Sequence, residues 1–151
     1  NKEEKKFLKN AKKTLGKKSF LFVGIDLIKN VKILKKAYND KGNHTAKFNL
    51  NLINIINKKL KTNLKIKDFK YVATFNKKKS SMENFLIAKK HLIFFINEKK
   101  FTFKKGEKIQ SEISNKFTIS KFSKLAKSSG WQVKKHWKDK KRYYAVFLLQ
   151  S

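Results

Sequence analysis

Hydrophobic residues near the start of the chain recur at helical spacing. Phe7, Leu8, Ala11 and Leu15 fall on one side of a 3.6-residue period, and Gly16 follows them. A glycine just after the last apolar position is a common helix end, because glycine adopts a left-handed backbone without steric penalty. The pattern predicts an amphipathic helix that ends at Gly16.

The pattern then changes to a continuous apolar run over residues 19–25, Ser-Phe-Leu-Phe-Val-Gly-Ile. Such a run is typical of a parallel strand that is buried on both faces. Asp26 and Lys29 follow it, and ligands of open α/β sheets bind at the carboxyl ends of strands. Asp26 and Lys29 are therefore candidates for the rim of a cleft, although a plain ion pair explains them equally well.

Helical spacing returns over residues 31–37, which deliver Tyr38, and over residues 45–60, where Thr45 is a candidate cap. Asn49 interrupts the apolar stripe of the second helix, and an asparagine inside a helix suggests a polar contact. We therefore add Asn49 to the candidates for the cleft rim.

The rest of the chain alternates as strands do, apart from one helix that begins after Thr118 and stops at Gly130. The expected strands form an antiparallel meander followed by a closing hairpin: residues 71–75, 82–88, 91–95, 100–103, 107–117, 131–137 and 143–149. Strand–helix units followed by antiparallel strands indicate an α/β fold.

Glu112 and Ser114 stand two residues apart in one of these strands, so alternation aims both side chains the same way. Ile109, Ile113 and Phe117 are expected to anchor the backbone. A carboxylate beside a hydroxyl makes an acceptor-plus-donor site that suits an imidazole or amine edge. Spacing alone also fits an exposed Glu112 that pairs with one of the many lysines.

Composition narrows the function classes. The 151 residues carry a formal charge of +30, which would normally indicate a nucleic-acid or membrane partner. However, Arg142 is the one arginine among 40 basic residues, whereas phosphate and base recognition favour arginine. No apolar run approaches the length of a membrane span. We expect no nucleic-acid or membrane partner, and the absence of cysteine fits a cytoplasmic setting.

Searches for common catalytic signatures find nothing. His44, His91 and His136 are too far apart for a local metal signature, and no cysteine is present, so no metal is expected. The chain has no nucleophile elbow, phosphate-binding loop or dinucleotide glycine fingerprint.

Four motifs nevertheless follow one another in order: Gly-Ile-Asp-Leu-Ile-Lys at 24–29, Ala-Tyr-Asn-Asp at 37–40, Thr-Ala-Lys-Phe-Asn-Leu-Asn at 45–51 and Ser-Glu-Ile-Ser-Asn-Lys-Phe at 111–117. Together they resemble the histidine-specific, S-adenosylmethionine-dependent methyltransferase family. The match covers essentially the whole chain, and four ordered motifs are far more specific than one.

The resemblance implies an α/β fold in which a Rossmann-like methyltransferase sheet, present in part, carries an inserted α+β substrate-binding domain. Residues 1–28 and 119–151 would belong to the methyltransferase domain, and residues 29–118 to the substrate-binding domain. The residues that bind S-adenosylmethionine would lie upstream, so we expect a fragment that is inactive alone. The whole enzyme is expected to be a cytoplasmic monomer.

The family's substrate contacts carry over residue by residue. Tyr38 matches the tyrosine that holds the α-carboxylate end of histidine, and Glu112 and Ser114 match the pair that grips the imidazole. One position departs, because Asn84 stands where the family has a methionine against the ring. An amide there would bond an imidazole nitrogen or mark another substrate. Asn43 also departs, since a glycine is usual in that turn.

The reaction that the resemblance implies is direct displacement. The neutral α-amine attacks the sulfonium methyl group of S-adenosylmethionine, and positioning supplies most of the rate enhancement. Repeated methylation gives trimethylhistidine (hercynine), a step of ergothioneine biosynthesis, and no covalent nucleophile is needed.

Three other hypotheses stay open. The chain would belong to a sibling methyltransferase for another amino acid or amine, as Asn84 suggests. Alternatively it would be a basic nucleic-acid-binding module, motivated by the charge of +30, or an inactive remnant of the enzyme.

Overall fold

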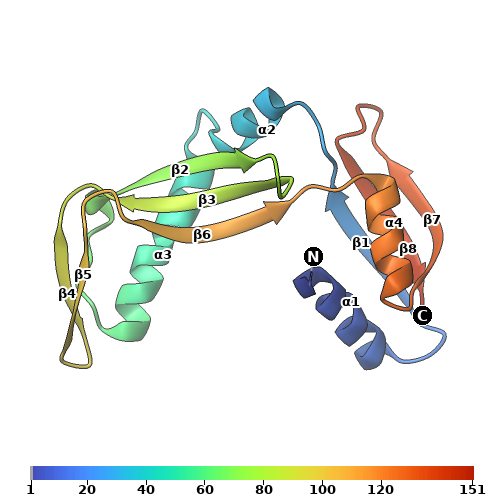
Figure 1. The fold of residues 1–151 in the computed structure, drawn as a ribbon, viewed down its shortest axis with the longest axis horizontal. Helices are drawn as coiled ribbons and strands as arrows, with labels where there is room; N and C mark the ends of the chain where they lie inside the picture. Colours follow the sequence, from blue (N-terminus) through green and yellow to red (C-terminus); the bar gives the residue numbers. More distant parts are fainter. Residues whose placement is uncertain (1) are drawn as a thin grey trace. The chain divides into compact units, whose positions relative to one another are not determined.

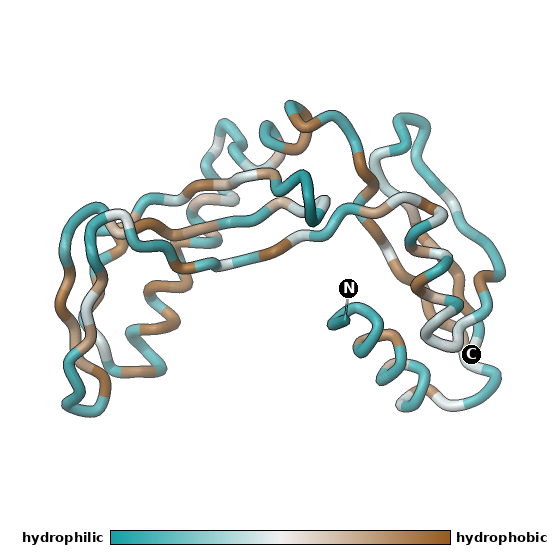
Figure 2. Tube along the Cα trace, viewed as in Figure 1, coloured by the Kyte–Doolittle hydropathy of each residue, from teal (hydrophilic) through white to brown (hydrophobic). Residues whose placement is uncertain are grey.

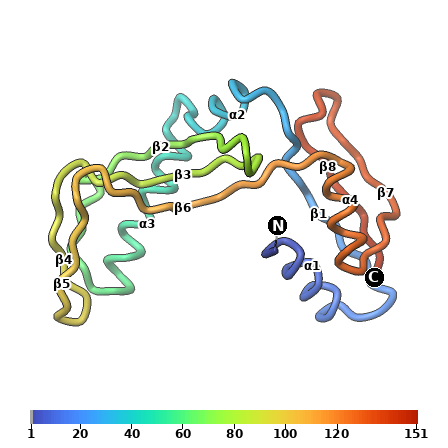
Figure 3. The backbone as a smooth tube through the Cα atoms, in the orientation of Figure 1, coloured from blue at the N-terminus to red at the C-terminus, as the bar shows by residue number. Residues whose placement is uncertain are grey.

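The computed structural model describes residues 2–151, which form two compact units (Figure 1). Unit 1 contains the described residues up to Lys29 together with Asn115–Ser151, and unit 2 contains Asn30–Ser114. The chain leaves unit 1 after its first strand and returns to it through the strand that precedes helix α4 (Figure 3). Assignment of the units to a methyltransferase and a substrate-binding domain, with limits at residues 28 and 118, stays a prediction.

Unit 1 is a three-stranded antiparallel sheet with two helices, and its strand order is β1-β8-β7. Its elements are α1 (Lys2–Leu15), β1 (Phe20–Asp26), α4 (Ile119–Ser128), β7 (Gln132–Lys138) and β8 (Tyr144–Gln150). Helix α1 ends as expected, because Gly16 has a φ of 79° and donates its N–H to the Lys12 carbonyl. Thr118 caps α4 as expected by accepting from the Lys121 N–H.

The core of unit 1 combines both helices with β8. Figure 2 shows α1 as mostly hydrophilic with isolated hydrophobic positions, and Leu8 is the one of these that is fully buried. The Trp131 indole donates to the Leu8 carbonyl at 2.8 Å, which ties α1 to the segment after α4. Other core members come from β1, α4 and β8: Ile25, Phe122, Leu125, Ala126, Ala145, Phe147 and Leu149.

The expectation of a parallel, doubly buried strand at residues 19–25 is wrong for the described chain. Strand β1 pairs antiparallel with β8, from Phe20 opposite Gln150 to Asp26 opposite Tyr144. Its burial alternates, and the Phe22 side chain is 64% exposed, although it stacks on Trp137. A continuous apolar run indicates a strand that packs against other parts of the protein, but it does not determine whether the neighbouring strand is parallel or antiparallel.

Gly24 leaves room for a side chain of the neighbouring strand. A Cβ atom at this position would overlap the hydroxyl end of the Tyr144 side chain. The glycine thus makes room for an aromatic ring from the neighbouring strand, which is a recognised use of glycine inside a strand.

Unit 2 packs a long helix against a three-stranded sheet of order β2-β3-β6. Ile53 of α3 is wholly buried, in a core shared with Phe69, Leu86 and Phe94. The elements are α2 (Val31–Tyr38), α3 (His44–Leu60), a short 3-10 helix (Ile66–Asp68), β2 (Phe69–Asn76), β3 (Ser81–Ala88), β4 (Leu92–Ile96), β5 (Lys99–Phe103) and β6 (Lys108–Asn115).

The expected meander is only partly right. Strands β4 and β5 form a separate two-stranded hairpin, and β6 returns to lie beside β3. Phe94 and Phe103 stack across this hairpin with ring centroids 5.2 Å apart. Local alternation identified each strand, but the choice between neighbours depends on contacts that are distant in sequence.

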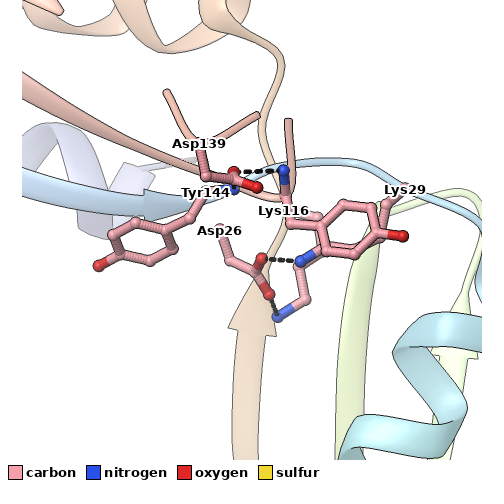
Figure 4. Close-up of polar contacts among 6 residues, drawn as sticks. Asp26, Lys29, Lys116, Asp139 and Tyr144 are labelled. Carbon is pink, nitrogen blue, oxygen red and sulfur yellow. Dashed lines mark hydrogen bonds and ion pairs between the residues drawn. The ribbon is translucent and has the colours of Figure 1, made fainter. Parts of the chain in front are cut away.

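A short parallel contact joins the two points where the chain leaves and re-enters unit 1. Leu27 bridges to Phe117, the Ile28 N–H donates to the Phe117 carbonyl at 2.9 Å, and the Phe117 N–H donates to the Asp26 carbonyl at 3.0 Å. Beside this contact, the Asp26 carboxylate lies between the ammonium groups of Lys29 and Lys116 (Figure 4). The Lys116 side chain is 0% exposed, and its Nζ is 2.8 Å from Asp26 Oδ2.

Among the described helices, none has both the length and the apolar character needed to cross a membrane.

Replacing Asp26 with Asn should lower the free energy of unfolding by about 3 kcal/mol, because it removes the carboxylate beside a buried ammonium group. The control Lys29→Ala leaves the Lys116 contact intact and should lower it by less than about 1 kcal/mol. Urea denaturation followed by circular dichroism measures both variants. Equal losses would show that the buried pair has no special weight.

Candidate functional site: a polar pocket of unit 2

A pocket of about 350 Å³ opens in unit 2 where the end of α2, the start of α3 and strand β6 meet. Tyr38 and Glu112, two of the residues expected to bind substrate, both line it, although 73 residues lie between them in the sequence. The remaining lining residues are Ala37, His44, Thr45 and Phe48. Its size falls within the range of small-molecule sites.

The pocket wall combines apolar and polar groups. The Phe48 side chain is 75% exposed, which is unusual for a large aromatic residue and leaves a ring face beside the pocket. The Tyr38 hydroxyl group both donates and accepts hydrogen bonds, whereas a Glu112 carboxylate only accepts them. The lining therefore suits a small ligand that has an apolar body, an N–H donor and a further polar end.

Helix α3 is held in place by Asp40. Asp40 Oδ2 accepts from the His44 N–H at 2.8 Å and Oδ1 from the Thr45 N–H at 2.9 Å, so this carboxylate supplies the helix cap. The expectation that Thr45 is the cap is wrong, because α3 already begins at His44. The hydrogen bonds from the Thr45 and His44 backbone lower the pKa of Asp40 to about 2.

Asn43 precedes α3 with a φ of 53°, in the left-handed region that favours glycine. Asparagine tolerates this conformation better than most residues. The turn into the pocket thus keeps the backbone shape that a glycine would adopt, and the departure at Asn43 carries no visible change of geometry.

Glu112 is held from behind by a buried amide. Asn84 Nδ2 donates to Glu112 Oε2 at 2.8 Å, and the Asn84 side chain is wholly buried. The Tyr71 hydroxyl lies 3.1 Å from Asn84 Oδ1 and 3.2 Å from the Tyr38 carbonyl oxygen. Burial, followed by the nearby negative charge of Glu112, raises the pKa of Tyr71 to about 12.

Asn84 thus lies behind the pocket wall, not on it. It was expected to contact substrate, but it is absent from the lining residues, and both ends of its amide have partners within the protein. Burial along β3 is nearly continuous because both faces of the strand are covered, and a side chain on either face therefore lies inside the protein.

Asn49 is also buried, whereas it was expected at a cleft rim. It is 3% exposed, donates from Nδ2 to the Thr45 carbonyl at 3.0 Å and lies 2.7 Å from the Ser111 hydroxyl. A polar contact does explain this asparagine inside a helix, but the contact ties α3 to β6 beneath the surface.

Ser114 is half-buried and is not among the residues that line the pocket. Ile113, an expected anchor, is 50% exposed, whereas Ile109 and Phe117 do pack against cores. The cause is a change of phase, because burial along β6 follows alternate residues up to Ser111 and resumes at Glu112.

Asp26 and Lys29 form the ion pair described for unit 1, and Lys29 Nζ also lies 5.1 Å from the centre of the Tyr143 ring. Figure 4 shows both lysines on the Asp26 carboxylate. Two oxygen atoms that each hold a lysine are engaged in structure, which favours the ion-pair interpretation of these residues.

Sequence reasoning gave no site role to Tyr71 or Ser111, and Asp40 was noted only as part of a turn and a motif. Tyr71 and Ser111 occupy inward positions of strands, and a polar residue at such a position is the signal that marks a buried contact. Among residues 2–151, no cluster of three or more His, Cys, Asp or Glu side chains is placed to hold a metal ion.

Acid should loosen the first turn of α3 through Asp40. A carboxyl whose pKa is lowered by folding stabilises the folded form above its ordinary pKa of 3.8, and this stabilisation is lost as the pH falls through about 2. The protection factors of the His44 and Thr45 amides, measured by NMR hydrogen exchange relative to the intrinsic rate at each pH, should therefore fall at low pH and be small at every pH in Asp40→Ala.

The control is Asp139→Ala, which removes the equivalent carboxylate from the β7–β8 turn of unit 1, where it accepts from the Tyr143 and Tyr144 N–H groups (Figure 4). It should leave the His44 and Thr45 amides unchanged. If the His44 and Thr45 amides of Asp40→Ala kept the protection factors of the unmodified protein, the capping role would be contradicted.

The amino-acid sequence is similar to those of known N-methyltransferases. The chain is 31% identical over 113 residues to the histidine N-alpha-methyltransferase of Mycolicibacterium smegmatis, covering 74% of this chain and 35% of that protein. It is 33% identical over 99 residues to the enzyme of the same name from Mycobacterium tuberculosis, covering 64% and 31%. The N-methyltransferase imqF of Aspergillus flavus is 26% identical over 131 residues, covering 86% and 36%.

The chain spans about a third of the length of these curated relatives. Among solved structures, an S-adenosylmethionine-dependent methyltransferase from Clostridium acetobutylicum superimposes with a TM-score of 0.44 at 12% identity, covering 97% of this chain and 50% of that one.

The family model described as "Histidine-specific methyltransferase, SAM-dependent" matches residues 1–151, the full extent of the sequence. The α/β chain with the Tyr38–Glu112 pocket therefore belongs to the family of histidine-specific, S-adenosylmethionine-dependent methyltransferases.

Proposed function

We propose that this chain forms the amino-acid-binding part of an N-methyltransferase that acts on the α-amino group of histidine with S-adenosylmethionine as methyl donor. The observation that carries the proposal is the pocket where Tyr38 and Glu112 meet, in a chain of the histidine-specific family. The product would be trimethylhistidine, which belongs to ergothioneine biosynthesis.

The residues of the pocket would bind and orient the amino acid. The Tyr38 hydroxyl would donate to the α-carboxylate, and Glu112 would accept an imidazole N–H, with Ser114 as a further ring contact. Two anchors at opposite ends of a small molecule fix the direction of its α-amine. Fixing a reacting group in this way contributes a large share of catalysis in reactions that need no covalent nucleophile.

We assign none of the described residues to the methyl donor, because the resemblance places its binding residues upstream. Gly24, the one glycine within a described strand, lies under the Tyr144 side chain. When bound, S-adenosylmethionine supplies an electrophilic methyl group, whereas the residues of this chain position the amine that receives it.

A second candidate function is methylation of a different amino acid or amine. Asn84 favours it, because this amide stands where the resemblance expects a methionine, and one relative is named as an N-methyltransferase without reference to histidine. The expectations of a monomer, a cytoplasmic setting and no nucleic-acid partner stay predictions.

Glu112→Ala should weaken histidine binding by about ten- to a hundredfold, since a hydrogen bond to a charged group contributes roughly 1.5–3 kcal/mol. Isothermal titration calorimetry on the full-length protein measures the change. The control Glu98→Ala removes the same charge from the β4–β5 turn and should leave the affinity unchanged. Equal behaviour of the two variants would overturn the assignment of Glu112.

The substrate is identified by mass spectrometry after incubation of the full-length protein with S-adenosylmethionine and a panel of histidine, its methylated forms and other amino acids. Trimethylhistidine supports the first function. Silence on histidine with turnover of another amine selects the second.

A further inference from the structure

Asn84 is a polar residue on an otherwise apolar face of β3. It is 0% exposed, and Met82 and Leu86, its neighbours on the same face, are 0% exposed as well. A buried amide is tolerated when its hydrogen-bonding groups have partners, because an unmade hydrogen bond in the interior is costly. Its partners therefore indicate why the position is polar.

The partners fix the orientation of the amide. Glu112 as a carboxylate only accepts hydrogen bonds, so the NH₂ end of Asn84 faces Glu112 Oε2, at 2.8 Å. The carbonyl end then faces Tyr71, whose hydroxyl group is the donor at 3.1 Å. The raised pKa of Tyr71 is consistent with a hydroxyl group that keeps its proton and remains a donor.

Tyr71 also reaches the opposite wall of the pocket. Its hydroxyl lies 3.2 Å from the carbonyl oxygen of Tyr38, the last residue of α2, where helical carbonyl groups lack partners within the helix. The single proton of this hydroxyl is shared between two acceptor oxygens, Asn84 Oδ1 and the Tyr38 carbonyl oxygen. The series Tyr38 carbonyl, Tyr71, Asn84 and Glu112 thus connects the two walls through groups that carry no charge until the carboxylate itself.

We propose that Tyr71 and Asn84 are positioning residues, which hold the Glu112 carboxylate and the end of α2 at a fixed separation. Asn84 takes one acceptor site of Oε2, so the acceptor sites that remain on the Glu112 carboxylate, those of Oε1 first, would receive a ligand N–H. The pocket would then select amino acids whose side chain brings one N–H donor, as a neutral imidazole does. This inference rests on the proposed function and adds that Asn84 acts through Glu112 without touching substrate.

A double-mutant cycle on the full-length protein tests the proposal. Asn84→Ala should weaken histidine binding by about tenfold in the presence of Glu112, the effect of one hydrogen bond to a charged group. In the Glu112→Ala background the same change should have almost no effect, because the atom that it positions is gone. Asn84→Met, which keeps four non-hydrogen atoms in the side chain but removes the amide, provides a second variant if Asn84→Ala folds poorly.

The matched control is Asn49→Ala, which removes another buried asparagine of unit 2 that contacts Ser111 and Thr45 and not Glu112. Its effect on affinity should be the same with and without Glu112. Tyr71→Phe should raise KM about threefold with little change in kcat, and should add nothing to Asn84→Ala.

The outcomes separate the two levels of the argument. If Glu112→Ala itself leaves histidine binding intact, the proposed function fails. If Glu112→Ala weakens binding but the loss from Asn84→Ala persists in that background, Asn84 acts on substrate or on the fold, and the positioning role is overturned.

Discussion

A buried ammonium group constrains unit 1 more than any other single charge. Lys116 lies out of contact with water and next to the Asp26 carboxylate, at the point where the end of β1 runs parallel to the segment after β6. A charge removed from water requires a counter-charge in close contact. The ion pair therefore fixes the two connections to residues 30–114 side by side, and an insertion at this point leaves the sheet of unit 1 intact.

Polar side chains in unit 2 form two layers, one that lines the pocket and one that lies behind it. Tyr38 and Glu112 line the pocket itself, and Tyr71, Asn84, Asn49 and Ser111 lie behind it with their hydrogen-bonding groups directed at one another or at backbone carbonyls. In a low-dielectric interior, a satisfied network of this kind is rigid, because every displacement breaks a bond that water does not replace. The layer behind thus converts a surface carboxylate into a residue with a defined direction.

The sequence foretold elements better than their partners. The helix termini at Gly16 and Thr118 and all eight expected strands follow from local spacing, because caps and alternation are properties of neighbouring residues. The direction of β1 and the separate β4–β5 hairpin did not follow, since they depend on distant pairing. Motif order led to Tyr38 and Glu112, which both line the pocket. Asn84 was expected to contact substrate and Asn49 to lie at a cleft rim, but both are buried. Composition does not distinguish an amide that binds a ligand from one that binds the protein.

The close approach of Tyr144 to Gly24 links two residues that are 120 positions apart in the sequence. A methyl group at position 24 would displace the Tyr144 ring toward solvent, so the identities of the two positions are coupled through the place of one aromatic ring. Packing against a neighbouring side chain is thus a sufficient reason for a glycine in the Gly-Ile-Asp motif, and a motif glycine can persist without contact to any ligand.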